Sequence, residues 1–263
     1  MKIILTIFLI TISFLVQAQD DLKWIINYYD YTSNYIQKPT KKDTTCINEI
    51  NEAKKDIENG KIVFCSPVGF LFGMLRFEDE LKEVVESYGL EFKIDLISDV
   101  EFEGQTQGCY GAYMTNFIEN KFGNDFIEKV YYQADSLYIK RVIDKNKIVD
   151  CWDCDIAPHM IGEKPDDNYT LTLYADTLNL PIDFNETILM DIDFIIELDS
   201  TTNNYHVSNK VLGTKQNEKY YQNLLDYSIN ELKKIDKWCP GQLKNSNIRT
   251  RQNARIYITK RKK

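Results

Sequence analysis

The clearest pattern of apolar and polar positions runs from Ile188 to Leu198. Every even-numbered residue in this segment is apolar, and three of the odd-numbered residues between them are acidic. Alternation with a period of two is typical of a strand that has one face in the core and the other in water. A weaker alternation over residues 205–211 predicts a second strand directly after the first.

A helix and a last strand follow. Apolar residues recur at three- and four-residue spacing over residues 218–237, which predicts a helix with one apolar face. Pro240 and Gly241 cannot continue this helix, because proline lacks the amide hydrogen and glycine favours the cap, so we expect a turn after Trp238. A final strand is predicted over residues 248–259. Its polar face carries Arg249, Arg251, Arg255 and Tyr257. Basic side chains along one face are typical of an exposed edge strand.

This order of elements resembles the TonB C-terminal domain as it occurs in many envelope proteins of Bacteroidetes-type bacteria. The resemblance covers about residues 187–259, and it rests on the strand 191–198, the helix 220–235 and the motif residues Trp238, Pro240 and Gly241. It implies a small antiparallel three-stranded sheet with a packed helix. The family usually has Asp followed by Gly after the first strand, whereas here Asp199 begins a longer polar loop.

The resemblance also implies a way of binding. In the family, the domain can bind an extended peptide along its sheet edge through main-chain hydrogen bonds. The corresponding surface here would be the strand 248–259, with Arg249, Arg251, Arg255 and Tyr257 on it. A full energy transducer of this family has a long proline-rich spacer, whereas the six prolines of this chain are scattered. We therefore expect a non-catalytic adaptor without a cofactor, whose partner is another envelope protein.

The N-terminus predicts export. A positive start at Lys2 is followed by an almost wholly apolar run over residues 3–16, and Ala18 is the small residue that signal peptidase requires. The run is shorter than the roughly 20 residues that a bilayer span needs. We expect residues 1–18 to be a cleaved signal peptide, the mature protein to be periplasmic or secreted, and no stable membrane insertion after cleavage.

The predicted fold class is α+β, with a mixed helix and strand domain at residues 19–165 and the TonB C-terminal-like domain at residues 166–263. The boundary is placed in the polar segment 162–168, which contains both glycine and proline. In the first domain the patterns predict helices over residues 22–36, 47–57, 77–88 and 113–122, and strands over residues 61–65, 137–143 and 147–149. A further strand is predicted over residues 169–175. Residues 108–143 are considered as a diverged copy of the C-terminal strand and helix unit.

Composition and charge limit the classes of partner. A content of 43% hydrophobic and 13% aromatic residues supports packed cores. The formal net charge of −8 and the pI near 5.0 argue against nucleic acid, because phosphate binding requires concentrated positive charge.

Six cysteines are the strongest candidates for chemistry. They are Cys46, Cys65, Cys109, Cys151, Cys154 and Cys239. An even number in an exported chain indicates disulfides, and six cysteines allow 15 pairings. Cys151 and Cys154 have the spacing of thiol–disulfide exchange, which requires the first thiol at a helix N-terminus. The residues that follow have no helical pattern, so a structural disulfide is favoured and an extracytoplasmic oxidoreductase is the alternative.

Other chemistry finds little support. A zinc site at Cys151, Cys154 and His159 lacks a fourth nearby ligand, and His206 lies in a predicted strand, so no metal is predicted. These two histidines belong to no hydrolase motif. A purely structural envelope component is the third interpretation.

Overall fold

The computed structural model describes residue 23 and residues 25–69, 75–98, 100, 102, 104–165, 169–178, 180–235 and 238–260. The expected signal peptide lies outside these residues. Within them the fold is a mixture of helices and sheets, in agreement with the predicted α+β class. The chain forms two compact units, Met1–Lys140 and Arg141–Lys263. These units divide at residues 140 and 141, whereas the expected domain boundary is at residues 165 and 166; the strand that follows residue 147 pairs within the C-terminal sheet.

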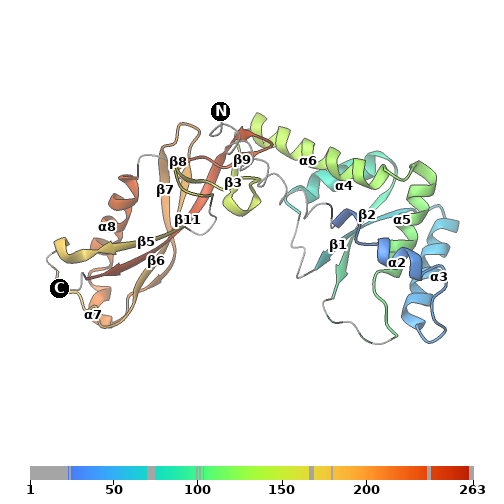
Figure 1. Cartoon of the computed structure of the whole chain (residues 1–263), viewed down its shortest axis with the longest axis horizontal. Helices are drawn as coiled ribbons and strands as arrows, with labels where there is room; N and C mark the ends of the chain where they lie inside the picture. Colours follow the sequence, from blue (N-terminus) through green and yellow to red (C-terminus); the bar gives the residue numbers. More distant parts are fainter. Residues whose placement is uncertain are drawn as a thin grey trace, which may run out of the picture. The chain divides into compact units, whose positions relative to one another are not determined.

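The N-terminal unit is built around a β-α-β element. Its helices are α2 (Asp30–Tyr35), α3 (Thr44–Glu58), α4 (Glu78–Ser87), α5 (Cys109–Phe122) and α6 (Phe126–Asp144), of which α6 continues into the second unit. Strands β1 (Val63–Gly69) and β2 (Glu91–Ile97) pair in parallel, and α4 connects them (Figure 1). A helical crossover is what a parallel pair requires, since a tight turn cannot reverse the chain direction twice.

The two faces of this small sheet are covered by different helices. Phe64 belongs to a cluster with residues of α4 and α6, including Leu81 and Tyr131. Its neighbour Cys65 belongs to a second cluster with residues of α3 and α5, such as Ala53. Adjacent residues of a strand point to opposite faces, so β1 is buried on both sides. This explains why its sequence reads as a continuous apolar run.

Two predictions for this unit are wrong. The predicted strand 137–143 lies within α6, whose buried residues Val130, Ala134 and Val142 recur at four- and eight-residue spacing. Residues 137–143 are helical because they continue an apolar stripe of α6 that already begins at Phe126. Residues 108–143 form two consecutive helices, α5 and α6, and no strand, so they are not a copy of the C-terminal strand and helix unit.

The C-terminal unit contains a five-stranded sheet. Its members are β3 (Ile148–Asp150), β5 (Tyr169–Tyr174), β6 (Ile188–Ile196), β7 (Thr202–Val211) and β11 (Arg249–Thr259), in the order β3-β11-β6-β7 with β5 also beside β11. Strand β6 pairs antiparallel with both β7 and β11. The remaining elements are η1 (Cys151–Asp153), β4 (His159–Met160), η2 (Ala175–Leu178), α7 (Lys215–Glu218), α8 (Tyr221–Lys233), β8 (Trp238–Cys239), β9 (Gln242–Leu243) and β10 (Ser246–Asn247).

The alternating pattern of β6 and β11 sorts their side chains as predicted. The even-numbered residues from Ile188 to Ile196 and from Thr250 to Ile258 are all buried. All of them except Thr250 and Gln252 belong to one apolar cluster with Leu224 and Leu232 of α8 and with Trp238. The sheet thus has one face in the core under α8, while the other carries charged and polar side chains.

The expectation of an exposed edge at β11 is wrong. Strand β11 pairs with β6 on one side, and on the other with β3 at residues 249–251 and with β5 at residues 254–259. Strand β5 is held there by its own apolar residues: Leu173 is buried in the core, and the ring of Tyr169 lies 5.1 Å from that of Trp238. β11 is consequently an interior strand of the sheet.

Candidate functional site

The polar face of the C-terminal sheet consists of three rows of hydrogen-bonded side chains. In each row an acid from β6 or its end lies between a donor from β11 and a donor from β7. The rows are Arg249–Glu197–Asn203, Asn253–Asp193–Ser208 and Arg255–Asp191–Asn209. Each row joins three strands, so the side chains reinforce the register that the backbone sets.

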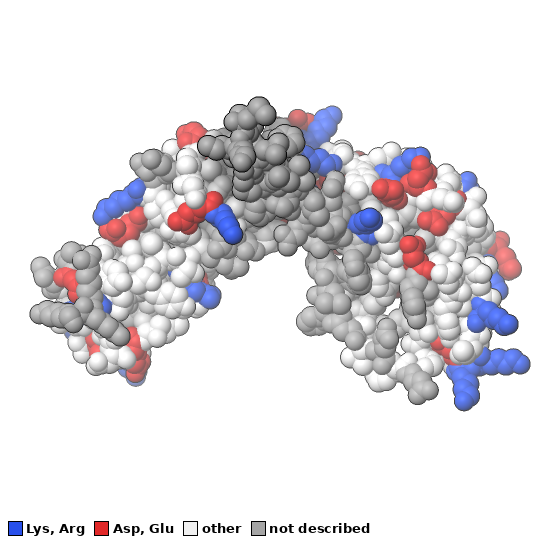
Figure 2. Space-filling model, viewed as in Figure 1, with Lys and Arg blue, Asp and Glu red and all other residues white. Residues whose placement is uncertain are grey.

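The predicted binding residues of β11 lie on this face, but most of them have partners there. Arg249 donates to Glu197 at 2.6 and 2.7 Å, Arg255 donates to Asp191 at 2.9 and 3.3 Å, and Arg251 donates to Asp150 of β3 at 2.9 Å. Hydrogen bonds from Arg249 and Asn203 hold the pKa of Glu197 below its ordinary value. Over the strands of this unit, Figure 2 shows blue atoms beside red ones. The arginines are therefore engaged in hydrogen bonds within the sheet. Tyr257, on the same face of β11, is partly exposed.

Strand β7 is at one end of the strand order in this sheet. The sequence pattern predicted a strand here but did not show that it is an edge strand. It contains ten residues, and β6 is its strand partner in the described part of the chain. Its pairing with β6 is irregular at two places, between Asp191 and Ile192 and between Asp193 and Ile195. Most of its residues are polar, and five of these polar residues are exposed: Asn204, His206, Ser208, Asn209 and Lys210. A polar strand of this length gives a weak alternation signal, which is why its position at the edge could not be inferred from the pattern.

The motif residues Trp238, Pro240 and Gly241 are all buried. The Trp238 ring lies 5.3 Å from Phe194 in the core. The Gly241 N–H donates to Thr250 Oγ1 at 2.9 Å. A Cβ atom at Gly241 would lie 2.6 Å from Cys154 Sγ, so a larger residue at this position would force its neighbours to shift. In this structure these three residues therefore pack within the C-terminal unit rather than lining an exposed surface.

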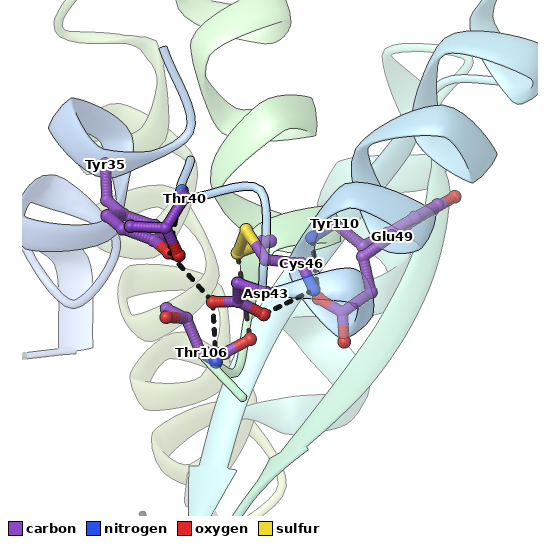
Figure 3. Close-up of a disulfide and its surroundings, with 8 residues drawn as sticks. Tyr35, Thr40, Asp43, Cys46, Glu49, Thr106 and Tyr110 are labelled. Carbon is purple, nitrogen blue, oxygen red and sulfur yellow. Dashed lines mark hydrogen bonds between the residues drawn. A yellow bond between two sulfur atoms is a disulfide. The ribbon is translucent and has the colours of Figure 1, made fainter. Parts of the chain in front are cut away.

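The cysteines are divided between the two units. Cys46 and Cys109 form a disulfide that joins the first turn of α3 to the first residue of α5 (Figure 3), as expected for at least part of the set. Both are buried, and so is Cys65 on β1, which is not bonded to another cysteine. In the second unit, Cys239 is half-buried on β8 and is likewise not disulfide-bonded.

The disulfide is surrounded by hydrogen bonds to two acids, Asp43 at the N-cap of α3 and Glu49 within α3 (Figure 3). Asp43, which is buried, accepts from the N–H groups of Cys46 and Thr106 and from the Tyr35 hydroxyl. Burial favours a higher pKa for Asp43, but these hydrogen bonds together lower its pKa. Glu49 accepts from the Tyr110 N–H at 3.1 Å, at the N-terminus of α5. Both acids thus satisfy helix N-termini, which is a structural task.

The pair Cys151 and Cys154 does not have the setting of a redox-active pair. Cys151 begins the three-residue turn η1 rather than a helix, and it is 1% exposed. Asp150 precedes it and Asp153 follows within the same turn. A low-pKa thiolate needs a helix dipole or basic neighbours and access to solvent. The geometry gives no support to the oxidoreductase alternative.

The two histidines lie on different strands of the C-terminal unit, His159 on β4 and His206 on β7. His159 Nδ1 lies 3.1 Å from the carbonyl oxygen of Ala157, and His206 lies on β7 in register with Asp193. Within the described ranges, no three His, Cys, Asp or Glu side chains are grouped in a way that would hold a metal ion. The helices among those same residues include none with the length and apolar character of a membrane span.

Comparison of the chain with protein-family models, with curated proteins and with solved structures gave no match.

Proposed function

We propose that the protein is a non-catalytic binding protein of the cell envelope, or a secreted one, that captures an extended segment of another envelope protein by strand addition. The observation that carries this proposal is β7, a ten-residue strand at the end of the five-stranded sheet. The backbone N–H and C=O groups of an end strand that point away from the sheet can pair with another chain. In the three side-chain rows, β7 donates hydrogen bonds to acids of β6 or its end, which adds to the backbone pairing that holds β7 in the sheet.

The resemblance to the TonB C-terminal domain supports binding by strand addition, but in that family the peptide binds at a different strand from β7. The family's peptide edge corresponds to β11, where β3 and β5 of the same chain now lie. Strand β7 is longer than either of these, with ten residues against three and six. A longer edge offers more main-chain hydrogen bonds, so we place the peptide at β7.

Two features support a location outside the cytoplasm. The sequence of residues 1–18 has the pattern of a signal peptide. The disulfide between Cys46 and Cys109 requires an oxidising compartment in most organisms. An exported adaptor would meet its partner there.

Site-specific photocrosslinking in the native cell tests the proposal. A photoreactive residue is placed on β7 at His206 or Val211, which are both exposed. Matched exposed positions are Thr172 on β5 and Asn223 on α8. We expect one envelope protein to be crosslinked from β7 and not from the other two positions. Adducts only from Thr172 would move the site to β5, and no adduct from any position would support a purely structural component.

Proline substitution tests whether main-chain hydrogen bonds carry the binding. His206 and Val207 pair with consecutive residues of β6, so one of their N–H groups points toward β6 and the other away from it. Proline at the inward position removes a sheet hydrogen bond and destabilises the protein, whereas proline at the outward position is tolerated. We expect the tolerated variant to keep its melting temperature and lose the crosslink. A tolerated variant that still crosslinks as before would contradict strand addition.

A further inference from the structure

Helix α8 runs along β7 in the opposite direction (Figure 1). Near one end, Lys210 Nζ of β7 lies 3.8 Å from the centre of the Tyr221 ring, at the start of α8. Near the other, Lys233 Nζ at the end of α8 lies 5.5 Å from the centre of the Tyr205 ring of β7. The two contacts agree in scale, because five residues of strand and twelve of helix both span about 17–18 Å.

The helix-facing side of β7 is defined by its register. Lys210 is opposite Met190, and Val207 is opposite Ile192. Met190 and Ile192 are buried in the core beneath α8. The Tyr205 ring stacks on Phe194 from the same side. Tyr205, Val207 and Lys210 therefore lie on the face of the sheet that α8 covers, at its outermost strand.

One line of residues on α8 faces this edge. Tyr221 and Lys233 both contact β7, and Leu225 and Ile229 lie between them at four-residue intervals on the same side of the helix. Leu225, Ile229 and Val207 are partly buried against the core. We call this surface, formed by Tyr205, Val207, Lys210, Tyr221, Leu225, Ile229 and Lys233, the β7–α8 rim. It is apolar in the middle and carries an ammonium group near each end.

The charges of the rim are suited to an anionic partner at the two ends. Lys210 and Lys233 are exposed, and among the described residues the contact of each ammonium group is with a tyrosine ring rather than a carboxylate. The ring holds the cation in place without neutralising it. Midway along α8, Asp226 accepts a hydrogen bond from Gln222 and adds a negative charge. Acidic groups are therefore favoured near the ends of the rim and disfavoured near its middle.

We infer that the segment bound at β7 is an extended peptide with acidic side chains on either side of a short apolar stretch. This inference rests on the proposed strand addition. Alternate residues of an added strand face α8, so the two acids are separated by an even number of positions. At about 3.4 Å per residue, the distance between the lysines corresponds to a spacing of roughly four or six residues.

Binding of designed peptides tests the charge pattern. Three fluorescein-labelled peptides share an alternating Val/Thr centre and differ only in two flanking residues six positions apart, which are Glu, Gln or Lys. Their affinities for the mature protein are measured by fluorescence polarisation at low and high salt. We expect the Glu peptide to bind about tenfold more tightly than the Lys peptide at low salt, because each exposed ion pair contributes a small, salt-sensitive amount.

Charge reversal identifies the residues responsible. The double variant K210E/K233E is expected to reverse the order and bind the Lys peptide best. K121E is the matched control, since Lys121 also lies over an aromatic ring, that of Phe122, but in the N-terminal unit. The order of the three peptides in K121E should equal that of the wild type. An unchanged order in K210E/K233E would overturn the inference.

The two proposals fail in different ways. Equal binding of all three peptides, with crosslinking from His206, would remove the acidic preference and leave strand addition in place. Absence of binding by every peptide, together with absence of crosslinking from β7, would remove both. Sequencing of the crosslinked segment gives an independent result, because a segment without acids at the expected spacing contradicts the inference alone.

Discussion

Arg255 of β11 and Asp191 of β6 face each other directly across the sheet, and the guanidinium group donates two hydrogen bonds to the carboxylate, at 2.9 and 3.3 Å. Asp191 is buried, and Asn209 of β7 donates a third hydrogen bond to it at 3.1 Å. Hydrogen bonds from Arg255 and then Asn209 hold the pKa of Asp191 below its ordinary value. One ionised carboxylate thus connects the three strands that lead to the proposed binding edge.

We predict that this carboxylate makes the C-terminal unit sensitive to acid. A group whose pKa is lower in the folded state stabilises the fold above its unfolded pKa, which is about 3.9 for Asp. That contribution is lost as the pH falls through the lower, folded pKa. D191N should therefore be less stable than the wild type near pH 7, and the difference should shrink as the pH falls below about 4. Urea unfolding at a series of pH values measures this.

The exposed Asp226 of α8 provides the control for that experiment. D226N should follow the wild-type curve closely at every pH. A gap between D191N and the wild type that stays constant down to pH 2 would show that the substitution acts through packing rather than through charge.

The disulfide between Cys46 and Cys109 should contribute strongly to the stability of the N-terminal unit. The two cysteines are 63 residues apart, and a cross-link that closes a loop of this length stabilises the fold by about 4 kcal/mol in the chain-entropy model. We expect C46A/C109A to lower the melting temperature of this unit by ten degrees or more, on the order of what such a loss implies. Differential scanning calorimetry with and without reductant measures it.

The same experiment distinguishes the cross-link from the packing of its sulfur atoms. C65A removes a buried sulfur from the same cluster without breaking a disulfide, so its effect should be much smaller. The reductant should affect the wild type far more than C46A/C109A. Equal losses in C65A and C46A/C109A would contradict a role for the cross-link.

Cys65 should be inert toward thiol reagents while the protein is folded. Burial raises the pKa of Cys65 to about 12, and its thiol is in the core beside α3 and α5. The reactive form is the thiolate, which is scarce at such a pKa. In iodoacetamide at pH 8, we expect Cys65 to remain unmodified while the half-buried Cys239 reacts, as read by peptide mass spectrometry. Labelling of Cys65 at the same rate as Cys239 would show that the N-terminal unit opens readily.

Some of the fold could be read from the sequence because it depends on local periodicity. The even-numbered positions of β6 and the apolar stripe of α8 repeat with the period of the element that they form, and both predictions are confirmed. Gly89 and Gly123 follow the ends of α4 and α5 with positive φ, which is typical of glycine at a helix C-terminus.

Local periodicity could not show that β11 is an interior strand of the sheet rather than an edge strand. Its arginines suggested an open edge, but their acid partners are distant in sequence: Asp191 is 64 positions from Arg255, and Asp150 is 101 positions from Arg251. Sequence pattern shows which face of a strand is polar, but it does not show which strand is its neighbour. For the same reason the β7–α8 rim could not be predicted. Lys210 and Lys233 form part of one surface only because β7 and α8 pack against each other, and the sequence pattern does not show that contact.

Gly241 lies directly against the side chains of Cys154 and Thr250. A methyl group at this position would lie 2.6 Å from Cys154 Sγ and 2.7 Å from Thr250 Oγ1, both well inside contact distance. We expect G241A to destabilise the C-terminal unit by about 1–3 kcal/mol, as for other overpacked sites. C154A removes the nearer obstacle, so the double variant G241A/C154A should be more stable than the sum of the two single changes predicts. Urea denaturation of the four proteins gives the coupling energy. Strict additivity would mean that the glycine is required for its backbone or its contact with Thr250, and not for the space beside Cys154.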